Sequence, residues 1–477
     1  MKKSSRKKII KPTSHKIQEL IKKKTLVFIS PENEWLLNNP IKISKTNKHF
    51  TFEIENKSFK KPSEALEDLD KAFSSTQMKG KNKYFTCFPY AADNIRTPPL
   101  PFEKISGTLN SLIEGEESDY DNKFLRFIQP LSRTPRIGNL SDALDLNTDQ
   151  EVMYGVGIIK LKISNYYFDI FRISEEKKEF IFIDSTQEMS IEDFSISVAA
   201  FFQAYSYIFG ILCGGESYIV SSKIESFEVI DNILFKYNPD EKVHNNYIFD
   251  SHEIREHKFS KSFFLFPCEV LTNMCDKLID EEKYRRTLMI IHEANLNEYS
   301  LSTCILFSSA LETISSLIAT ENKGLCRINE DRFATSELIT KLTEKVKENK
   351  ILKEEDKKFI IEKKLPNLNN PTNTDKFESP FIKYKISLPS NFKKALKYRD
   401  KYFHGSIPEG NMLGTFRANN LNRAFELQFL VNVLTLKYVG YRGFLKNRSI
   451  EMEYYTQKEQ GKKDEDITIN QSLYYKI

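Results

Sequence analysis

The sequence predicts an α+β protein, in which a β-rich N-terminal domain precedes an all-α helical bundle. Short runs of β-branched and aromatic residues, separated by Asn, Glu, Lys, Gly or Ser, dominate residues 25–265, and such runs are typical of strands. From residue 266 onward, apolar residues recur with the 3.6-residue period of helices. The 477 residues are enough for two or three domains, each with its own core.

The composition is that of a folded globular protein. A hydrophobic fraction of 40% and a charged fraction of 29% exclude a disordered chain, and 16 Gly and 17 Pro are too few for a collagen-like or linker-dominated one. The formal net charge of +5 is compatible with a nucleic-acid partner. Six cysteines without a CxxC pair, and a basic start that no apolar signal segment follows, favour reduced thiols and a cytoplasmic location.

Two segments stand out by their charge. Residues 1–24 form a basic N-terminal segment with ten Lys and Arg against one acid, Glu19. A solvated tail, a surface helix and a phosphate-seeking arm all fit this charge run. Residues 194–213 form the longest uncharged run and are long enough to span a bilayer. Their polar residues and the lack of a second such run favour a buried core helix, so we expect no membrane partner.

The β-rich domain is expected to contain one helix among its strands. The expected strands cover residues 25–30, 49–55, 152–163, 166–173, 179–184, 217–222 and 227–237. The polar stretch between residues 173 and 181 predicts a hairpin connection. The helix is expected over residues 191–212 and should end at the glycines of residues 213–215, because glycine tolerates the left-handed C-cap conformation. The sequence GGES at residues 214–217 predicts a turn.

The helical domain is assigned to residues 266–445. Its expected helices cover residues 277–297, 300–319, 331–349, 390–403 and 413–439. Ser390 is the expected N-cap of the short fourth helix. Residues 350–389 contain four prolines and predict an irregular stretch. Residues 446–477 are rich in charge and are expected to form a C-terminal tail.

The sequence offers no familiar metal or cofactor motif. Among seven histidines, HEIREH at residues 252–257 comes nearest to a zinc site, but its histidines are five apart and do not share a helical face. There is no GxxxxGK[ST] phosphate loop, no GxGxxG after a strand, no GxSxG elbow and no kinase signature. We therefore expect the protein to use neither a metal nor a cofactor.

One segment, ALKYRDKYFHGSIP at residues 395–408, contains candidate catalytic residues. Arg399 and His404 are five positions apart, and Gly405 ends the helix at the histidine. Apolar residues at helical spacing place Arg399 on the packing side of the helix, together with Phe392, Ala395, Leu396 and Phe403. Burying an unpaired guanidinium is unfavourable, so this side must meet a partner, a pocket or an anion.

Such a pair suits phosphodiester cleavage without a metal. The planar guanidinium of Arg399 can grip a phosphate, and His404 can move a proton near neutral pH. The negative end of the helix favours the protonated form of the imidazole. The spacing alone also fits a surface ion pair at Arg399 and a C-cap at His404.

The chain resembles the HEPN family, small helical bundles that are frequently ribonucleases. YRDKYFHG looks like the R-[N/D]-x3-H-G signature of HEPN domains. FSSALETISSLI at residues 307–318 is similar to the ALE helix of the Apea-like branch, found in bacterial antiphage defence proteins. The order of helices agrees over about residues 270–445, and residues 25–265 resemble the N-terminal domain of Apea-type proteins only loosely.

The resemblance implies roles for individual residues. Arg399 would stabilise the phosphate and His404 would act as general acid and base, in a cleft shared by two subunits of a homodimer. Asp400 stands where many members have Asn, and Glu312 on the ALE helix would orient Arg399 or a neighbour. The tyrosines of the motif helix would stack on bases or pack in the core, and its lysines would follow the RNA backbone: Tyr398, Tyr402, Lys393, Lys394, Lys397 and Lys401.

Two functions follow as hypotheses. In the first, the protein is an RNA endonuclease of antiphage defence that cleaves cellular RNA, with tRNA among the candidate targets. The N-terminal domain then restrains the nuclease or senses a phage-derived trigger. In the second, the bundle is a non-catalytic dimerisation module and the N-terminal domain binds a partner.

Overall fold

The computed structural model divides the chain into two compact units, Met1–Ile279 and Asp280–Ile477, with mixed α and β structure. The expected α+β class is confirmed at this level. The sequence-based boundary lies earlier, at residues 265/266, whereas the structure keeps α6 (Cys268–Asp280) almost entirely in the first unit. There Asp276 Oδ1 accepts a hydrogen bond of 2.7 Å from the backbone N–H of Ser164.

The structure describes residues 3–29, 36, 39–46, 49–55, 62–75, 77–80, 83–89, 104–131, 140, 144–145, 157–175, 178–212, 214–238, 242–243, 247–249, 265–297, 301–321, 332–368, 373–403, 413–459 and 474–477.

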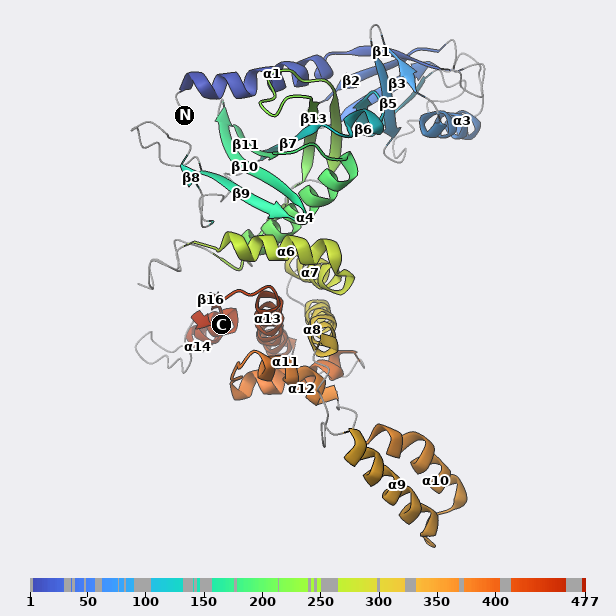
Figure 1. The fold of residues 1–477 in the computed structure, drawn as a ribbon, viewed down its shortest axis with the longest axis vertical. Helices are drawn as coiled ribbons and strands as arrows, with labels where there is room; N and C mark the ends of the chain where they lie inside the picture. The colour runs from blue at the N-terminus through green and yellow to red at the C-terminus, as the bar shows by residue number, and fades with distance from the viewer. Residues whose placement is uncertain are drawn as a thin grey trace. The chain divides into compact units, whose positions relative to one another are not determined.

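The first six strands of the first unit form a closed antiparallel barrel (Figure 1). Its strands are β1 (Lys24–Phe28), β2 (Ile41–Lys45), β3 (Phe50–Glu55), β4 (Met78–Lys79), β5 (Tyr84–Pro89) and β6 (Lys104–Glu114). They follow the order β3-β2-β1-β4-β5-β6, and β3 closes the ring by pairing with β6. Alternate residues of β3, Phe50, Phe52 and Ile54, are buried, as a period of two requires. Phe73 of α3 (Pro62–Ser75) packs edge-on against Phe52 at 5.2 Å.

Strand β6 belongs both to the barrel and to a more open part of the sheet. Beyond its barrel partners it pairs with β14 (Ile233–Asn238), for example Phe235 with Leu112. From β14 the sheet continues through β13 (Gly215–Ser222), β7 (Phe124–Leu131), β11 (Lys178–Ser185), β10 (Tyr166–Glu175), β9 (Gly157–Ile163) and β8 (Leu144–Asp145). The expected hairpin is confirmed, because β10 and β11 pair down to Glu175 and Lys178.

Two predictions about β13 and β14 were wrong. The strand expected from residue 227 starts only at Ile233, because Phe227 adopts φ 53° in a loop that precedes the strand. The GGES segment is not a turn, because Gly215, at φ 87°, opens β13 opposite Asn238.

Helix α4 (Ile191–Phe209) is the core helix expected from the uncharged run. Ser190 caps it by accepting a 3.0 Å hydrogen bond from the N–H of Asp193, and Phe201 and Tyr205 are fully buried. The helix ends earlier than expected, at Gly210, which takes the left-handed conformation at φ 70°. The next residues form β12 (Ile211–Leu212) and pair with β15 (Lys242–Val243).

The basic N-terminal segment forms a helix, α1 (Lys3–Ile21), in which Thr13, Lys16 and Leu20 are buried, so this part is not a solvated tail. Lys16 is 7% exposed, and its Nζ donates hydrogen bonds to Glu114 Oε1 at 2.9 Å and to the carbonyl of Asp231 at 2.7 Å. Arg126 Nη1 donates to the buried Thr13 hydroxyl at 3.2 Å. Burial lowers the pKa of Lys16, against the raising effect of the Glu114 carboxylate.

The second unit is built mainly of helices, with α8 (Leu301–Glu321) packed against α7 (Glu282–Leu296), α11 (Asn373–Lys383), α12 (Ser390–Phe403) and α13 (Leu413–Tyr438) (Figure 1). Helices α8, α9 (Arg332–Glu348), α12 and α13 confirm their predictions. The single helix expected over residues 277–297 is two, because Glu281 leaves the helical conformation between α6 and α7. Residues 301–319 are long and apolar enough to span a membrane, with a mean hydropathy of 1.5, and half of them are buried inside the unit.

The irregular stretch and the tail predicted near the C-terminus were both wrong within the described residues. Residues 354–367 form α10 (Glu354–Phe359), a π-helix (Ile360–Lys364) and a 3-10 turn (Leu365–Asn367). Pro380 lies inside α11, where burial of its neighbours outweighs its poor helix propensity. Helix α14 (Arg448–Glu459) follows β16 (Phe444–Lys446), which pairs with β17 (Tyr474–Lys476) near the chain end.

Gly107 of β6 can be tested as a packing requirement of the barrel. A Cβ atom at this position would lie 2.6 Å from Phe52 Cε1 in the core. We expect Gly107→Ala to lower the free energy of unfolding by about 1–3 kcal/mol, as over-packing does. Denaturant unfolding measures this. In a Phe52→Leu background the same change should cost clearly less, and an equal cost in both backgrounds would contradict the contact.

Glu114 can be tested as the partner of a buried ammonium. We expect Glu114→Ala to cost about 3–5 kcal/mol, because Lys16 stays buried without its carboxylate. Glu55→Ala is the matched control, since the pair Lys42–Glu55 is nearly half exposed and should contribute less than about 1 kcal/mol. Equal effects of the two changes in denaturant unfolding would refute the role of Glu114.

Candidate functional site

The guanidinium of Arg399 lies on the inner side of α12, as the sequence predicts. Arg399 is 3% exposed, and its Cζ lies 3.0 Å from the centroid of the Phe377 ring on α11. Phe392, Ala395 and Leu396 are buried on the same helix. Arginine stacks well on aromatic faces, and such contacts strengthen when water is excluded. The partner that the buried guanidinium requires is therefore, at least in part, an aromatic ring of the same unit.

A second arginine, Arg423 of α13, contacts the neighbouring tyrosine of α12. Its Cζ lies 5.1 Å from the Tyr398 ring centroid, and its Nη1 donates to Glu426 Oε2 at 2.5 Å. Asn391 Nδ2 donates to the other oxygen of Glu426 at 3.3 Å. Burial raises the pKa of Glu426, while Arg423 and Asn391 act in the opposite direction. This cluster joins the start and the middle of α12 to α13.

The sequence analysis missed Arg423 and Glu426. The sequence predicted only a helix over residues 413–439, although a signal was present in RAFELQF, where two charges interrupt the apolar run. At helical spacing they are one turn apart, so an ion pair within α13 was predictable. Their contacts with Tyr398 and Asn391 were not, because these depend on how α12 packs on α13.

The outer face of α12 is basic. Lys393, Lys394 and Lys397 are exposed, as expected for a charge run. The helix itself is held from the opposite side, where Phe392 stacks on Phe429 of α13 at 5.0 Å. Helix α12 ends at Phe403, immediately before His404. His404 and the side chains of Asp400, Lys401 and Tyr402 lie outside the described residues, so their roles stay predictions.

The structure brings the other predicted site residues together only in part. Glu312 is exposed on α8, whereas Arg399 is buried against Phe377, so an orienting role of Glu312 toward Arg399 stays a prediction. Tyr398 is half-buried beside Arg423, and its stacking on a base stays a prediction. Within the described residues no cluster of His, Cys, Asp and Glu could hold a metal ion, and residues 252–257 lie outside them.

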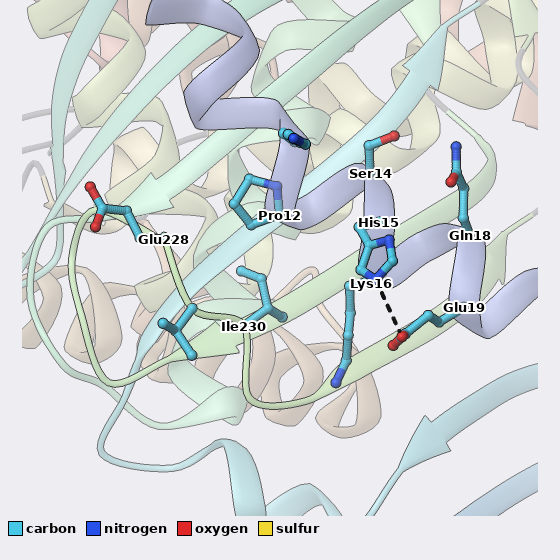
Figure 2. A pocket seen from close by; sticks show the side chains of 10 residues that line it. Pro12, Ser14, His15, Lys16, Gln18, Glu19, Glu228 and Ile230 are labelled. Carbon is cyan, nitrogen blue, oxygen red and sulfur yellow. Dashed lines mark ion pairs between the residues drawn. The ribbon is translucent and has the colours of Figure 1, made fainter.

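A groove beside α1 in the first unit is an alternative to the α12 region (Figure 2). It has a volume of about 790 Å³ and is lined by one side of α1 and by Glu228, Val229 and Ile230. His15 Nε2 and Glu19 Oε1 form an ion pair of 3.4 Å there, with side chains 70% and 47% exposed. Exposed pairs of this kind contribute little and are not held in place for a ligand. The α12 region remains the better candidate.

Comparison of the chain with protein-family models, curated proteins and solved structures gave no match. The candidate site is therefore argued from its residues alone. Its established features are the buried Arg399 beside Phe377, the Tyr398–Arg423–Glu426 cluster and the basic outer face of α12.

The contact between Arg399 and Phe377 can be measured by a double-mutant cycle. We expect Arg399→Met and Phe377→Leu to couple by about 1–2 kcal/mol in denaturant unfolding, because the pair is desolvated. The pair Lys364 and Phe359, at 5.3 Å with Phe359 54% exposed, is a matched control and should couple by at most about 0.5 kcal/mol. Coupling no larger than in the control would show that the ring does not stabilise the charge.

Proposed function

We propose that the second unit is a metal-independent RNA endonuclease of the HEPN type, acting at the C-terminal end of α12. The observation that carries this proposal is the position of Arg399. It lies on the inner face of α12, fixed by Phe377, and the helix ends one residue before His404. The exposed Lys393, Lys394 and Lys397 add a positive surface on the same helix, which suits a phosphate backbone.

The proposed reaction is transesterification within the RNA. The 2′-oxygen attacks the neighbouring phosphorus while a base removes its proton, and the bond from phosphorus to the 5′-oxygen breaks as an acid protonates that oxygen. The products are a 2′,3′-cyclic phosphate and a free 5′-hydroxyl. His404 supplies proton transfer and Arg399 stabilises the phosphate. Because Arg399 is 3% exposed, phosphate contact requires that the contact between α11 and α12 opens when RNA binds.

We further propose that the active species is a homodimer. A single Arg399–His404 motif offers one proton-transfer group, whereas the reaction uses a base and an acid, and a two-fold pair of motifs supplies both. In this account the enzyme serves antiphage defence in the cytoplasm, with tRNA among its targets, and the first unit restrains it or responds to a phage-derived trigger.

The second candidate function is a non-catalytic interaction module. The burial of Arg399 against Phe377 favours it, because a guanidinium in this position already has a packing role without RNA. The two functions differ in whether His404 is needed for RNA cleavage while the fold is retained.

We expect His404→Ala to lower cleavage of an RNA substrate by about 100- to 10,000-fold in purified protein, since it removes the proton-transfer group. Wild-type activity should persist in EDTA. His15→Ala, which changes an exposed histidine of α1, is the matched control and should cleave normally. Full activity of His404→Ala, with an unchanged circular dichroism spectrum, would support the non-catalytic function instead.

Subunit mixing tests the shared cleft. When excess His404→Ala protein exchanges subunits with wild type, we expect activity to fall well below the wild-type fraction, because heterodimers lack one of two histidines. Analytical ultracentrifugation should show a dimer under the same conditions. Activity that scales with the wild-type fraction, or a fully active monomer, would contradict the composite site.

A further inference from the structure

The first unit contains a small cavity that the proposed nuclease function does not use. It has a volume of about 270 Å³ and lies between α4 and strands β7, β13 and β14 of the open part of the sheet. Ligand pockets combine apolar walls with a few fixed polar groups. This cavity has both, and all of its described lining belongs to the first unit.

Two aromatic rings form its apolar corner. Phe127 of β7 and Phe202 of α4 have ring centroids 5.2 Å apart and planes inclined at 56°. A flat apolar group placed against both rings would gain face and edge contacts together.

Two buried polar side chains line the same cavity. Gln129 and Ser217 are each 2% exposed. Gln129 Nε2 donates to the carbonyl of Gly214 at 2.6 Å, and Ser217 Oγ donates to the carbonyl of Lys236 at 3.2 Å. These bonds fix both side chains and use one donor of each. A primary amide has four hydrogen-bonding positions, so Gln129 still offers an acceptor and a donor, and the Ser217 oxygen still accepts.

The charge of the lining is positive. Lys236 of β14 is exposed and lines the cavity, and no carboxylate is among its described lining residues. On β13, Glu216 precedes Ser217 and therefore points to the opposite face of the sheet. Its carboxylate is paired there with Lys45 at 2.6 Å. Lys236 would thus attract an anionic group of a ligand, and the Glu216 carboxylate would not compete with that group for the lysine.

We propose that this cavity binds a small aromatic carboxylate, with its ring against Phe127 and Phe202, its carboxylate at Lys236 and a polar ring substituent at Gln129 and Ser217. The volume limits the ligand to about the size of one substituted ring. The proposal stands independently of RNA cleavage, because it uses no residue of the second unit.

The test uses the full-length protein and 4-hydroxybenzoate as probe, followed by isothermal titration calorimetry and thermal unfolding. We expect saturable binding and a rise in the unfolding temperature of a few degrees at saturation. 4-Hydroxybenzamide, which keeps the ring and the hydroxyl without the charge, should bind about 10-fold more weakly or worse, because it loses a charge-assisted hydrogen bond. Inorganic phosphate, which has no ring, should not compete.

Variants assign the binding to this cavity. Lys236→Gln should weaken binding of 4-hydroxybenzoate about 10-fold and leave binding of 4-hydroxybenzamide nearly unchanged. Lys223→Gln, at an exposed loop lysine, should change neither. Phe202→Leu should weaken both ligands. The proposal would be overturned if 4-hydroxybenzoate shows no saturable binding up to about 10 mM. It would also be overturned if Lys236→Gln binds 4-hydroxybenzoate as well as wild type does, or if inorganic phosphate competes with it.

Discussion

Arginine stays charged under all physiological conditions, and a protein that buries one must arrange its neighbours around the charge. In the second unit that residue is Arg399, and the ring of Phe377 lies directly against its guanidinium. The contact fixes which side of α12 faces the bundle, since Phe392 and Leu396 share that side. Lys393, Lys394 and Lys397 are consequently exposed on the opposite side of the helix, and α12 ends immediately before His404. Every functional role argued for α12 depends on this constraint.

Local patterns in the sequence were reliable where the structure depends on local physics. The alternation in β3 and the long apolar period of α8 each reflect interactions within a few residues. The placement of Arg399 on the packing face was predictable for the same reason. The predicted end of α4 was wrong because two glycine positions could each end the helix, and the prediction chose Gly214 and Gly215, four and five residues after Gly210.

Features set by distant residues were not predictable from such patterns. The closure of the barrel requires β3 to find β6, and β16 pairs with β17 almost thirty residues later in the chain. The contacts of Arg423 with Tyr398 and of Phe377 with Arg399 likewise depend on the packing of separate helices. A sequence pattern indicates which residues need a contact partner, but the identity of that partner depends on how the helices and strands pack in the folded protein.

Basic residues have two different roles in this chain. In the first unit Lys16 and Arg126 attach α1 to the sheet, through Glu114 and Thr13, and are withdrawn from solvent. On α12, by contrast, Lys393, Lys394 and Lys397 are exposed. A net charge of +5 therefore says little by itself about nucleic acid, whereas the distribution of the exposed charges is informative.

The most direct test of the central claim is the chemistry of RNA ends in cells that express the protein. RNA would be sequenced with a method that captures 2′,3′-cyclic phosphates, after induction of wild type and of His404→Ala at matched protein levels. The account predicts new cyclic-phosphate ends at defined positions in the wild-type sample and their loss in the variant. The same ends in both samples, or new ends that carry 3′-hydroxyls, would contradict it.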